Sequence, residues 1–310
     1  MSVYLGIDTS NYTTSAAIFD SEKNVYINSR KLLAVGSGEI GLRQSDALFQ
    51  HTKNLPEILK LALKDNPNID AVGVSTRPRD VDGSYMPCFL AGVSAANAAA
   101  LSLGVPLIEF SHQAGHIAAA LYSANRLDLI GEKFISFHVS GGTTEALLVE
   151  FTKDLKLTAK IIGQSTDLKM GQAVDRIGNM LGLNFPAGKE LDKLAIVGEW
   201  NEPIKVSVKG CDCSVSGLQN KAEQLRAIGV PAENIARFTI EFLNKTLVKM
   251  TENIIAEYGN LPLVFAGGVM SNSIISKSLT EKFGATFALP ELSSDNAVGI
   301  AVLASLQHKV

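Results

Sequence analysis

Two histidines four residues apart are the first residues in this sequence whose types and spacing suggest chemistry. His112 and His116 occur in the segment "SHQAGHIAAALYSA", which is expected to form a helix. At positions i and i+4 both imidazoles project from one face about 5–6 Å apart, which suits two ligands of one metal ion. The same spacing also occurs by chance on solvated helices, so the pair alone leaves both interpretations open.

A small polar centre lies between two apolar runs in the stretch "HVSGGTTEALLV", residues 138–149. This pattern predicts a hairpin turn between two strands. The centre carries Gly141 and Gly142, which leave backbone amides open to an anionic group. The stretch is therefore both a turn and a candidate ligand site.

Two further segments carry candidate ligand groups. In "LVFAGGVMSNSII", Gly267 and Gly268 lie between an expected strand and a helix beginning near Asn272, an arrangement that favours phosphate at the helix N-terminus. The alternative is a tight turn in which Asn272 caps the helix.

The segment "STDLKMGQAVDRIGNMLGL" is expected to form a helix over about 167–182. Its spacing places Asp167, Gly171 and Asp175 on one stripe that could bind ribose hydroxyls. A solvated face is the alternative, and it is the favoured interpretation for Asp167.

The elements that must position these residues occur twice along the chain. Alternating apolar runs predict three strands within residues 3–33 and three more within 133–163, and each triplet is followed by helix, strand, helix, strand and helix. A polar hairpin follows the first strand of each triplet, at Asp8-Thr9-Ser10-Asn11 and at Ser140-Gly141-Gly142-Thr143. The order βββαβαβα predicts two α/β halves, residues 1–125 and 126–310, the second with an insertion at about 184–232.

This repeated order resembles the duplicated actin-like ATPase fold of actin, sugar kinases and heat-shock chaperones, in which two halves face each other across a nucleotide cleft. His112 is expected to open the helix after the last strand of the first half, and Ser294-Asp295 the equivalent helix of the second. Helix starts related in this way should meet, which adds Asp295 to the histidine pair as a His-His-carboxylate metal site. Iron or zinc suits these ligands better than magnesium alone.

Composition sets the class of protein. The 310 residues are 46% hydrophobic and 19% charged, as in a globular protein. No run approaches the roughly 20 apolar residues of a membrane span, and the N-terminus lacks a basic signal-peptide region, so a cytoplasmic location without membrane attachment is expected. The three cysteines, Cys88, Cys211 and Cys213, are too few for a disulfide framework and are expected to be structural thiols. A net charge of −3 excludes a global basic field for nucleic acid.

The same segments together resemble the TsaD family, the catalytic subunit of the KEOPS complex, whose members were formerly called O-sialoglycoprotein endopeptidases. The resemblance rests on "GIDTSNYTTSAAIFD", "SHQAGH", "VSGGTT", "GQSTDLKMGQAVDRIGNMLGL", "FPAGKELDKLA", "CSVSGLQN", "AGGVMSN" and "LSSDNAVGIA", in the family's order almost from end to end. It implies transfer of a threonylcarbamoyl group from threonylcarbamoyl-adenylate to the exocyclic amine of the tRNA adenosine that follows the anticodon. It also implies TsaB-like and TsaE-like partner proteins.

Matching positions give the implied site. His112, His116 and Asp295 would bind one divalent metal ion, iron or zinc, and Asp8 and Asp175 would be catalytic. ATP or an adenylate, with magnesium as a further candidate, would bind at these residues: Val139, Ser140, Gly141, Gly142, Thr143, Asp175, Gly188, Gly267, Gly268 and Asn272. A metal would polarise the carbamoyl carbonyl while AMP leaves, so no covalent protein nucleophile is needed.

Two departures from the family pattern bear on the substrate. Thr143 stands where the family has His, and the loop "STRPRDVDGSYMPC", residues 75–88, replaces a Thr-x-Gly-Pro-Gly pattern. These departures keep two alternatives open. The chain could be a divergent paralogue that acts on another acceptor as a carbamoyl transferase or nucleotide-binding protein, or a non-catalytic scaffold subunit.

Overall fold

The computed structural model describes residues 2–10, 12–35, 42–65, 67–152, 155–293 and 295–308. The chain forms two compact units. Unit 1 comprises residues 1–132, 150–158 and 291–310, and unit 2 comprises residues 133–149 and 159–290. The division at residue 125, which follows the sequence repeat, stays a prediction. The compact units have other bounds than this division, because the last helix of the chain packs on strands of unit 1.

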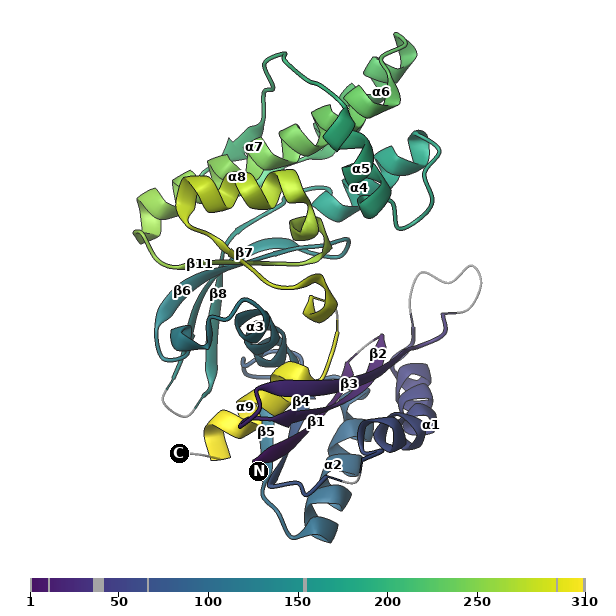
Figure 1. Ribbon diagram of the computed structural model, residues 1–310, viewed down its shortest axis with the longest axis vertical. Coiled ribbons are helices and arrows are strands. Elements are labelled where there is room, and N and C mark those ends of the chain that lie inside the picture. Colours follow the sequence, from purple (N-terminus) through teal and green to yellow (C-terminus); the bar gives the residue numbers. More distant parts are fainter. Residues whose placement is uncertain are drawn as a thin grey trace. The chain divides into compact units, whose positions relative to one another are not determined.

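Unit 1 contains a five-stranded sheet in the order β3-β2-β1-β4-β5 (Figure 1). The strands are β1 (Val3–Ser10), β2 (Thr13–Asp20), β3 (Val25–Leu32), β4 (Ala71–Arg77) and β5 (Leu107–Ser111). β1 pairs with β2, and β2 with β3, in antiparallel register, while β4 and β5 continue the sheet in parallel. The three strands expected at the N-terminus are confirmed; Asn11 of the expected hairpin lies outside the described residues.

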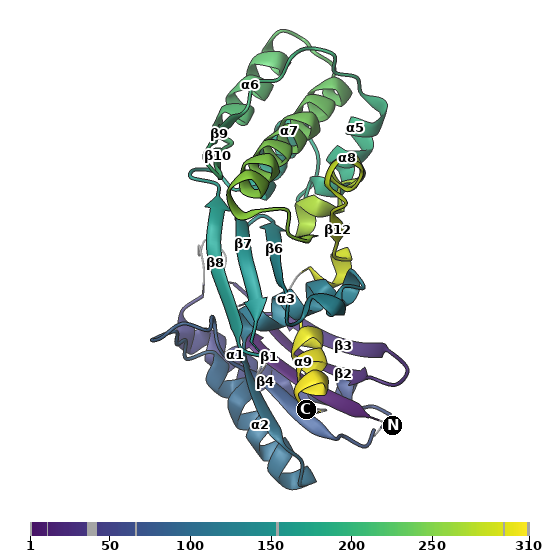
Figure 2. The same ribbon diagram turned by 90° about the vertical axis from the view of Figure 1, so that its left-hand side faces the viewer.

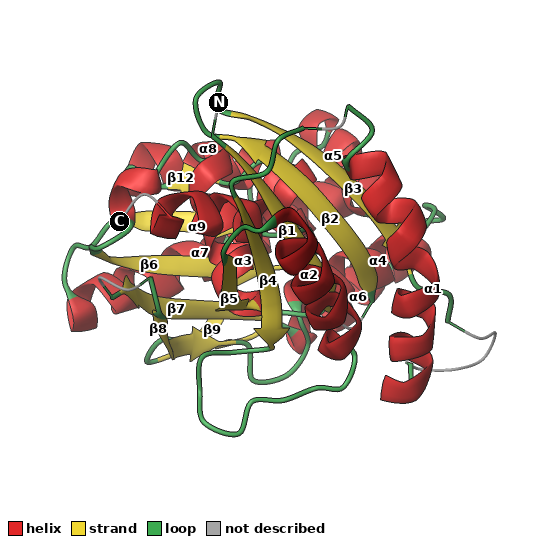
Figure 3. Ribbon diagram, turned by 90° about the horizontal axis from the view of Figure 1, so that it is seen from below, coloured by secondary structure: helices red, strands yellow, loops and turns green. Residues whose placement is uncertain are grey.

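Helices cover both faces of the unit 1 sheet. These helices are α1 (Gln44–Ala62), α2 (Phe89–Leu103), α3 (His112–Ser123), the short 3-10 helix η1 (Leu127–Leu129) and α9 (Val298–His308). α1 and α2 contact β2, β1 and β4 on one face, and Figure 3 shows α2 in front of β1 and β4. Because side chains alternate along a strand, the face of β1 with Gly6 and Asp8 is the one turned to α3 and α9.

Close backbone approach fixes α9 against α3 and the sheet. A Cβ at Gly6 would lie 2.7 Å from the amide nitrogen of Ala301, and a Cβ at Gly299 would meet the carbonyl oxygen of Gly115 in α3. Only glycine allows these contacts, since both partners are backbone atoms. Helices α3 and α9 are therefore held as one layer on β1 and β4.

The start of α9 differs from the expectation. We expected a helix opening at Ser294-Asp295, but α9 begins at Val298, and Ser294 lies outside the described residues. Asn296 accounts for the later start, because its Oδ1 accepts a hydrogen bond from the Val298 amide at 3.0 Å. Asp295 lies in the turn before the helix rather than in it.

Unit 2 contains a five-stranded sheet in the order β12-β11-β6-β7-β8. Read from β8 to β12, this order matches that of the unit 1 sheet from β3 to β5. Its strands are β6 (Lys133–Val139), β7 (Thr144–Phe151), β8 (Leu157–Gln164), β11 (Leu263–Ala266) and β12 (Thr286–Phe287). β11 and β12 lie parallel to β6, as β4 and β5 lie parallel to β1. The same strand order in both sheets confirms the predicted duplication.

The large core of unit 2 lies between this sheet and a layer of helices. The helices are α4 (Met170–Met180), α5 (Gly188–Val197), α6 (Ser216–Ala227), α7 (Ala232–Tyr258), α8 (Ser273–Phe283) and the 3-10 helix η2 (Gly268–Ser271). The 3-10 helix η3 (Pro290–Leu292) begins at the last residue of unit 2 and continues into unit 1. Figure 2 shows α5, α6, α7 and α8 gathered beyond one side of β6, β7 and β8. Phe137 and Phe265 stack in this core with ring centroids 4.3 Å apart.

The expected insertion at 184–232 contains α5, α6 and a two-stranded ribbon of β9 (Ser207–Lys209) and β10 (Asp212–Ser214). α5 and α6 pack on α7, and so the insertion belongs to the core of unit 2. None of the helices in the described residues combines the length and apolar character that crossing a bilayer requires.

Candidate functional site

The two histidines lie in the first two turns of α3, in unit 1. Ser111 caps this helix: its side-chain oxygen accepts a hydrogen bond from the Ala114 amide at 3.1 Å. The imidazole rings of His112 and His116 are 4.3 Å apart between centroids. Both side chains are 21% exposed, and so the pair is accessible to a small ligand.

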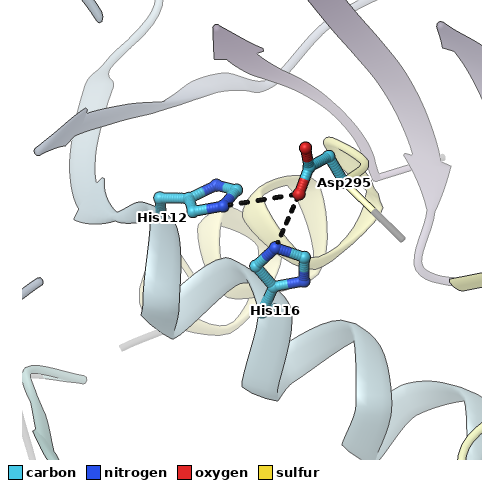
Figure 4. A group of neighbouring side chains, drawn as sticks. All are labelled: His112, His116 and Asp295. Atoms are coloured by element: carbon cyan, nitrogen blue, oxygen red, sulfur yellow. Dashed lines mark hydrogen bonds and ion pairs between the residues drawn. The ribbon is translucent and has the colours of Figure 1, made fainter. Parts of the chain in front are cut away.

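Asp295 completes a three-residue cluster with the histidines (Figure 4). Its Oδ1 lies 3.1 Å from Nε2 of His116 and 3.7 Å from Nε2 of His112. Its Oδ2 accepts a hydrogen bond of 3.3 Å from the Thr13 hydroxyl of β2. The carboxylate indicated by the sequence repeat therefore lies beside the histidines, although Asp295 precedes α9 instead of opening it.

Asp8 supports His112 from the sheet. This carboxylate is fully buried on β1, and its Oδ1 accepts hydrogen bonds from His112 Nδ1 at 3.0 Å and from the Ser75 hydroxyl of β4 at 2.5 Å. Burial alone would raise the pKa of Asp8, but the His112 imidazole and the Ser75 hydroxyl hold it below its usual value. The ionised Asp8 therefore accepts the hydrogen bond from Nδ1 and leaves His112 Nε2 directed at Asp295.

The cluster fits a metal ion by the chemistry of its donors. Two imidazole nitrogens and a carboxylate oxygen lie within 4.8 Å of one another, the only such group among the described residues. Ligand atoms about 2.1 Å from one ion lie about 3.0–3.5 Å apart, near the separations from Asp295 to the histidines. An Nδ1 hydrogen bond to a carboxylate is the usual support of a metal-binding histidine. The cluster could therefore hold one zinc or iron ion with open positions.

In unit 2 the hairpin after β6 is fixed against the start of α4. Its turn is closed by a hydrogen bond of 2.7 Å from the Ser140 amide to the Thr143 carbonyl and by one of 3.1 Å from the Thr143 amide to Ser140 Oγ. The Gly171 amide of α4 donates to the Ser140 carbonyl at 3.1 Å. A Cβ at Gly171 would lie 2.5 Å from the Gly141 nitrogen, so glycine is required there.

This hairpin borders a pocket of about 670 Å³, within the usual size range of small-molecule sites. Five residues of the expected nucleotide set line it: Gly141, Asp175, Gly188, Gly268 and Asn272. They come from the hairpin, α4, α5, η2 and the cap of α8, segments spread along the chain from residue 141 to residue 272. The structure thus brings together residues that are far apart in the chain.

The other five residues of that set do not line the pocket. Val139 is fully buried, and Gly267, with φ of 106°, lies so close to Val139 that a Cβ would meet its carbonyl oxygen. Ser140, Gly142 and Thr143 form the turn of the hairpin. In this structure Val139 and Gly267 hold β6 and β11 together, and the other three shape the hairpin.

Asn272 is a helix cap in the structure. Its Oδ1 accepts hydrogen bonds from the amides of Ile274 and Ile275, at 3.1 and 3.0 Å, and its Nδ2 donates to Asp192 Oδ1 at 2.7 Å. The capping interpretation of Asn272 is therefore confirmed; the residue also lines the pocket, and its binding of a ligand stays a prediction. Asp192 and Lys189 on α5 line the same pocket and were missed, because nothing in "GKELDK" distinguishes a pocket-facing residue from a solvated one.

Asp167 does not share a helical stripe with Asp175, because α4 begins only at Met170. Its carboxylate accepts hydrogen bonds from the amides of Val215 and Ser216, at 2.9 and 3.1 Å, at the start of α6. Burial would raise the pKa of Asp167, but these amides and the hydroxyls of Ser214 and Ser216 lower it. Asp167 therefore ties the segment before α4 to the start of α6. Asp175 instead lies at the pocket and accepts a hydrogen bond of 2.9 Å from the Ala187 amide.

The three cysteines are buried, and burial raises the pKa of each thiol to about 11. Because the thiolate is the reactive form, we expect the folded protein to react with a thiol-specific chromogenic reagent at pH 8 about 100-fold more slowly than the denatured protein. Stopped-flow absorbance gives both rates. A native thiol that reacts as fast as the denatured ones would contradict the structural role.

The fold and its sites define the class of protein first. The chain has the duplicated actin-like α/β fold, as does component A of (R)-2-hydroxyglutaryl-CoA dehydratase from Acidaminococcus fermentans, a solved structure that matches over 100% of both chains with a TM-score of 0.54 and 14% identity. The sequence model of the family described as "TsaD: tRNA N6-adenosine threonylcarbamoyltransferase" matches residues 39–302. The chain belongs to this family of enzymes, which confirms the resemblance found in its sequence.

Curated relatives agree with this assignment over nearly the whole chain. A protein from Methanopyrus kandleri named tRNA N6-adenosine threonylcarbamoyltransferase is 28% identical, and the match covers 99% of this chain and 88% of the relative. A protein of the same name from Thermosipho africanus is 31% identical, with 97% and 92% covered. The similarity is therefore not confined to the segments with candidate site residues.

Proposed function

We propose that this enzyme transfers the threonylcarbamoyl group of threonylcarbamoyl-adenylate to the exocyclic amine of the tRNA adenosine next to the anticodon. Membership of the family supports the reaction. The observation that carries the proposal is the convergence of two imidazole nitrogens and the Asp295 carboxylate on one point of unit 1. TsaB-like and TsaE-like proteins and tRNA would be its partners, and the cysteine content supports a cytoplasmic location.

In this proposal His112, His116 and Asp295 hold one iron or zinc ion, which supplies a Lewis acid for the carbamoyl oxygen when it is bound. Asp8 acts as the positioning residue of His112, because its buried carboxylate accepts the Nδ1 hydrogen bond. The resemblance implied a catalytic role for Asp8, and the geometry favours support of the imidazole instead. Thr13 orients Asp295 in the same way, through the carboxylate oxygen not shared with the histidines.

The pocket of unit 2 is the proposed site of the adenylate. Gly141 would present a backbone amide to the phosphate, as the open glycines of the hairpin suggest. Asp175 and Asp192 are carboxylates on the pocket wall and would accept hydrogen bonds from ribose hydroxyls. Since Asn272 already bonds Asp192, it would hold that carboxylate in place.

A second candidate is transfer to an acceptor other than tRNA. It is favoured by the charged loop 75–88, in which Arg79, Val81, Asp82 and Tyr85 are exposed. Large exposed side chains in this loop change which acceptor molecules can reach unit 1, compared with the glycine-containing loop of the family pattern. The catalytic groups would be the same in both candidates, and only the acceptor would differ.

The experiment combines the purified chain, its TsaB-like and TsaE-like partners, a divalent metal and threonylcarbamoyl-adenylate with unmodified tRNA. Nucleoside analysis by mass spectrometry is expected to show threonylcarbamoyladenosine. Release of AMP without modified adenosine would favour the second candidate. A folded, metal-loaded protein that neither releases AMP above the uncatalysed rate nor modifies tRNA would refute both.

A further inference from the structure

The loop between β4 and α2 contacts the start of the histidine helix through an arginine–carboxylate pair. Nε and Nη2 of Arg77 donate to Asp80 Oδ1 at 3.1 and 2.6 Å. The side chain of Asp80 is only 12% exposed and that of Arg77 is 32% exposed. Two donors on one planar guanidinium fix the carboxylate more firmly than a single ammonium would.

The second oxygen of Asp80 reaches the cap of α3. Oδ2 accepts a hydrogen bond of 2.7 Å from the hydroxyl of Ser111, which is fully buried. A serine hydroxyl has one proton, so donation to Asp80 directs an oxygen lone pair at the Ala114 amide, 3.1 Å away. Asp80 therefore sets the direction of the cap that starts α3.

The loop backbone holds the same turn. The Pro78 carbonyl accepts a hydrogen bond of 3.0 Å from the Gln113 amide. Residues 111 and 113 are thus both tied to the loop, and His112 lies between them at the first position of α3. An end turn is the part of a helix that frays most readily, so its metal ligand depends on such support.

We infer that Asp80 is a positioning residue for the His112 side of the metal cluster, acting through Ser111 and held in turn by Arg77. The inference rests on the proposed function insofar as it takes His112 as a metal ligand. Substitution of Asp80 keeps all three metal ligands but removes the hydrogen bond to Ser111 that holds the first turn of α3, where His112 lies. Metal affinity then falls, and His116, one turn further along α3, keeps its environment.

Zinc binding by the metal-free full-length chain tests this without any substrate. Competition with a chromogenic zinc chelator gives the affinity of wild type and variants. We expect Asp80→Ala and Ser111→Ala each to weaken zinc binding by about 10-fold, the lower end of the effects seen when groups that orient metal ligands are removed. Ser111→Thr keeps the capping hydroxyl and is expected to restore binding to within about twofold of wild type.

A matched control is the pair of Arg126 and Asp128, which lies just beyond the other end of α3 with Nε 3.0 Å from Oδ1. Asp128→Ala removes an arginine–aspartate pair of the same unit and should leave zinc affinity unchanged. The double variant Asp80→Ala/Ser111→Ala should bind zinc no more weakly than either single variant, since both act through one hydrogen bond. Circular dichroism shows whether each variant is folded.

Unchanged zinc affinity in a folded Asp80→Ala protein would overturn the inference. A double variant that loses zinc affinity by the product of the two single losses would overturn it as well. Should Asp80→Ala not fold, Arg77→Gln, which leaves the carboxylate in place, is expected to lower the affinity in the same direction by a smaller factor; no change would count against the inference. Failure of the proposed function is separate, because it appears as a wild-type chain that binds zinc and transfers nothing.

Discussion

His116→Ala is expected to lower threonylcarbamoyl transfer by at least about 100-fold and to abolish stoichiometric binding of the metal. The reason is that Nε2 of His116 makes the shortest contact of the cluster, 3.1 Å from Asp295 Oδ1, and the variant leaves only one imidazole and one carboxylate. Removing residues that merely support metal ligands costs about 10- to 100-fold in affinity or activity, so loss of a ligand should reach at least the upper end. Metal content after dialysis and the yield of modified nucleoside measure the two effects.

His308→Ala is the matched control for this change. His308 ends α9 in the same unit, and its contacts are with Tyr4, whose hydroxyl lies 3.4 Å from Nδ1 and whose ring packs edge-on against the imidazole. The variant removes an imidazole from unit 1 without touching the cluster, so metal content and transfer should stay within about twofold of wild type. Equal losses in the two variants would mean that any histidine change disturbs the unit, and the assignment of His116 as a ligand would lose its support.

The proximity of the two histidines and Asp295 could be predicted from sequence, because each of the three leaves a local or a repeated signal. His112 and His116 have helical spacing, and the duplicated order of elements points to Asp295 although it is 179 residues from His116. The support of the cluster leaves no such signal. Asp8 and Ser75 meet because β1 and β4 are parallel neighbours with Ile7 opposite Val74, and strand order in space is a property of the whole sheet.

The errors have physical causes in local hydrogen bonding. Helical periodicity extends over Asp167, yet its carboxylate bonds amides at the start of α6, and α4 begins three residues later. The start of α9 shifted for a related reason, because Asn296 bonds the Val298 amide and holds the chain in a turn. Polar residues with short side chains compete in this way for backbone amides at helix ends, and apolar spacing does not detect that competition.

Only some of the residues expected at the ligand site line the pocket. Residues that line a pocket and residues that hold its surrounding backbone in place look alike in sequence. Gly141 lines the pocket, whereas Gly267 lets β11 end close against the backbone of Val139 in β6. Both occur in glycine pairs that suggest phosphate binding. What distinguishes them is the neighbour that a side chain would meet. A Cβ at Gly141 would meet nothing within 4 Å, but one at Gly267 would strike Val139. Such contacts are set by packing between β6 and β11.

Gly171→Ala is expected to displace the hairpin that borders the pocket of unit 2. The new Cβ would lie 2.5 Å from both the Gly141 nitrogen and the Ser140 carbonyl carbon, and these are backbone atoms that cannot rotate away. The hairpin must therefore move away from α4, which breaks the bond from the Gly171 amide to the Ser140 carbonyl. Overpacking of this kind costs about 1–3 kcal/mol, and a site displaced by about 1 Å can lose about 100-fold in rate.

AMP binding by calorimetry and the yield of modified nucleoside measure this displacement. We expect AMP affinity to fall by about 10-fold or more, in proportion to the roughly 1–3 kcal/mol of strain. Gly217→Ala is the control, since a Cβ at this exposed position of α6 would meet nothing within 4 Å, and alanine in a helix is favoured over glycine by about 0.5–1 kcal/mol. It should bind AMP as wild type does and unfold at the same or a higher temperature. Wild-type AMP affinity in a folded Gly171→Ala protein would mean that the hairpin does not form part of the adenylate site.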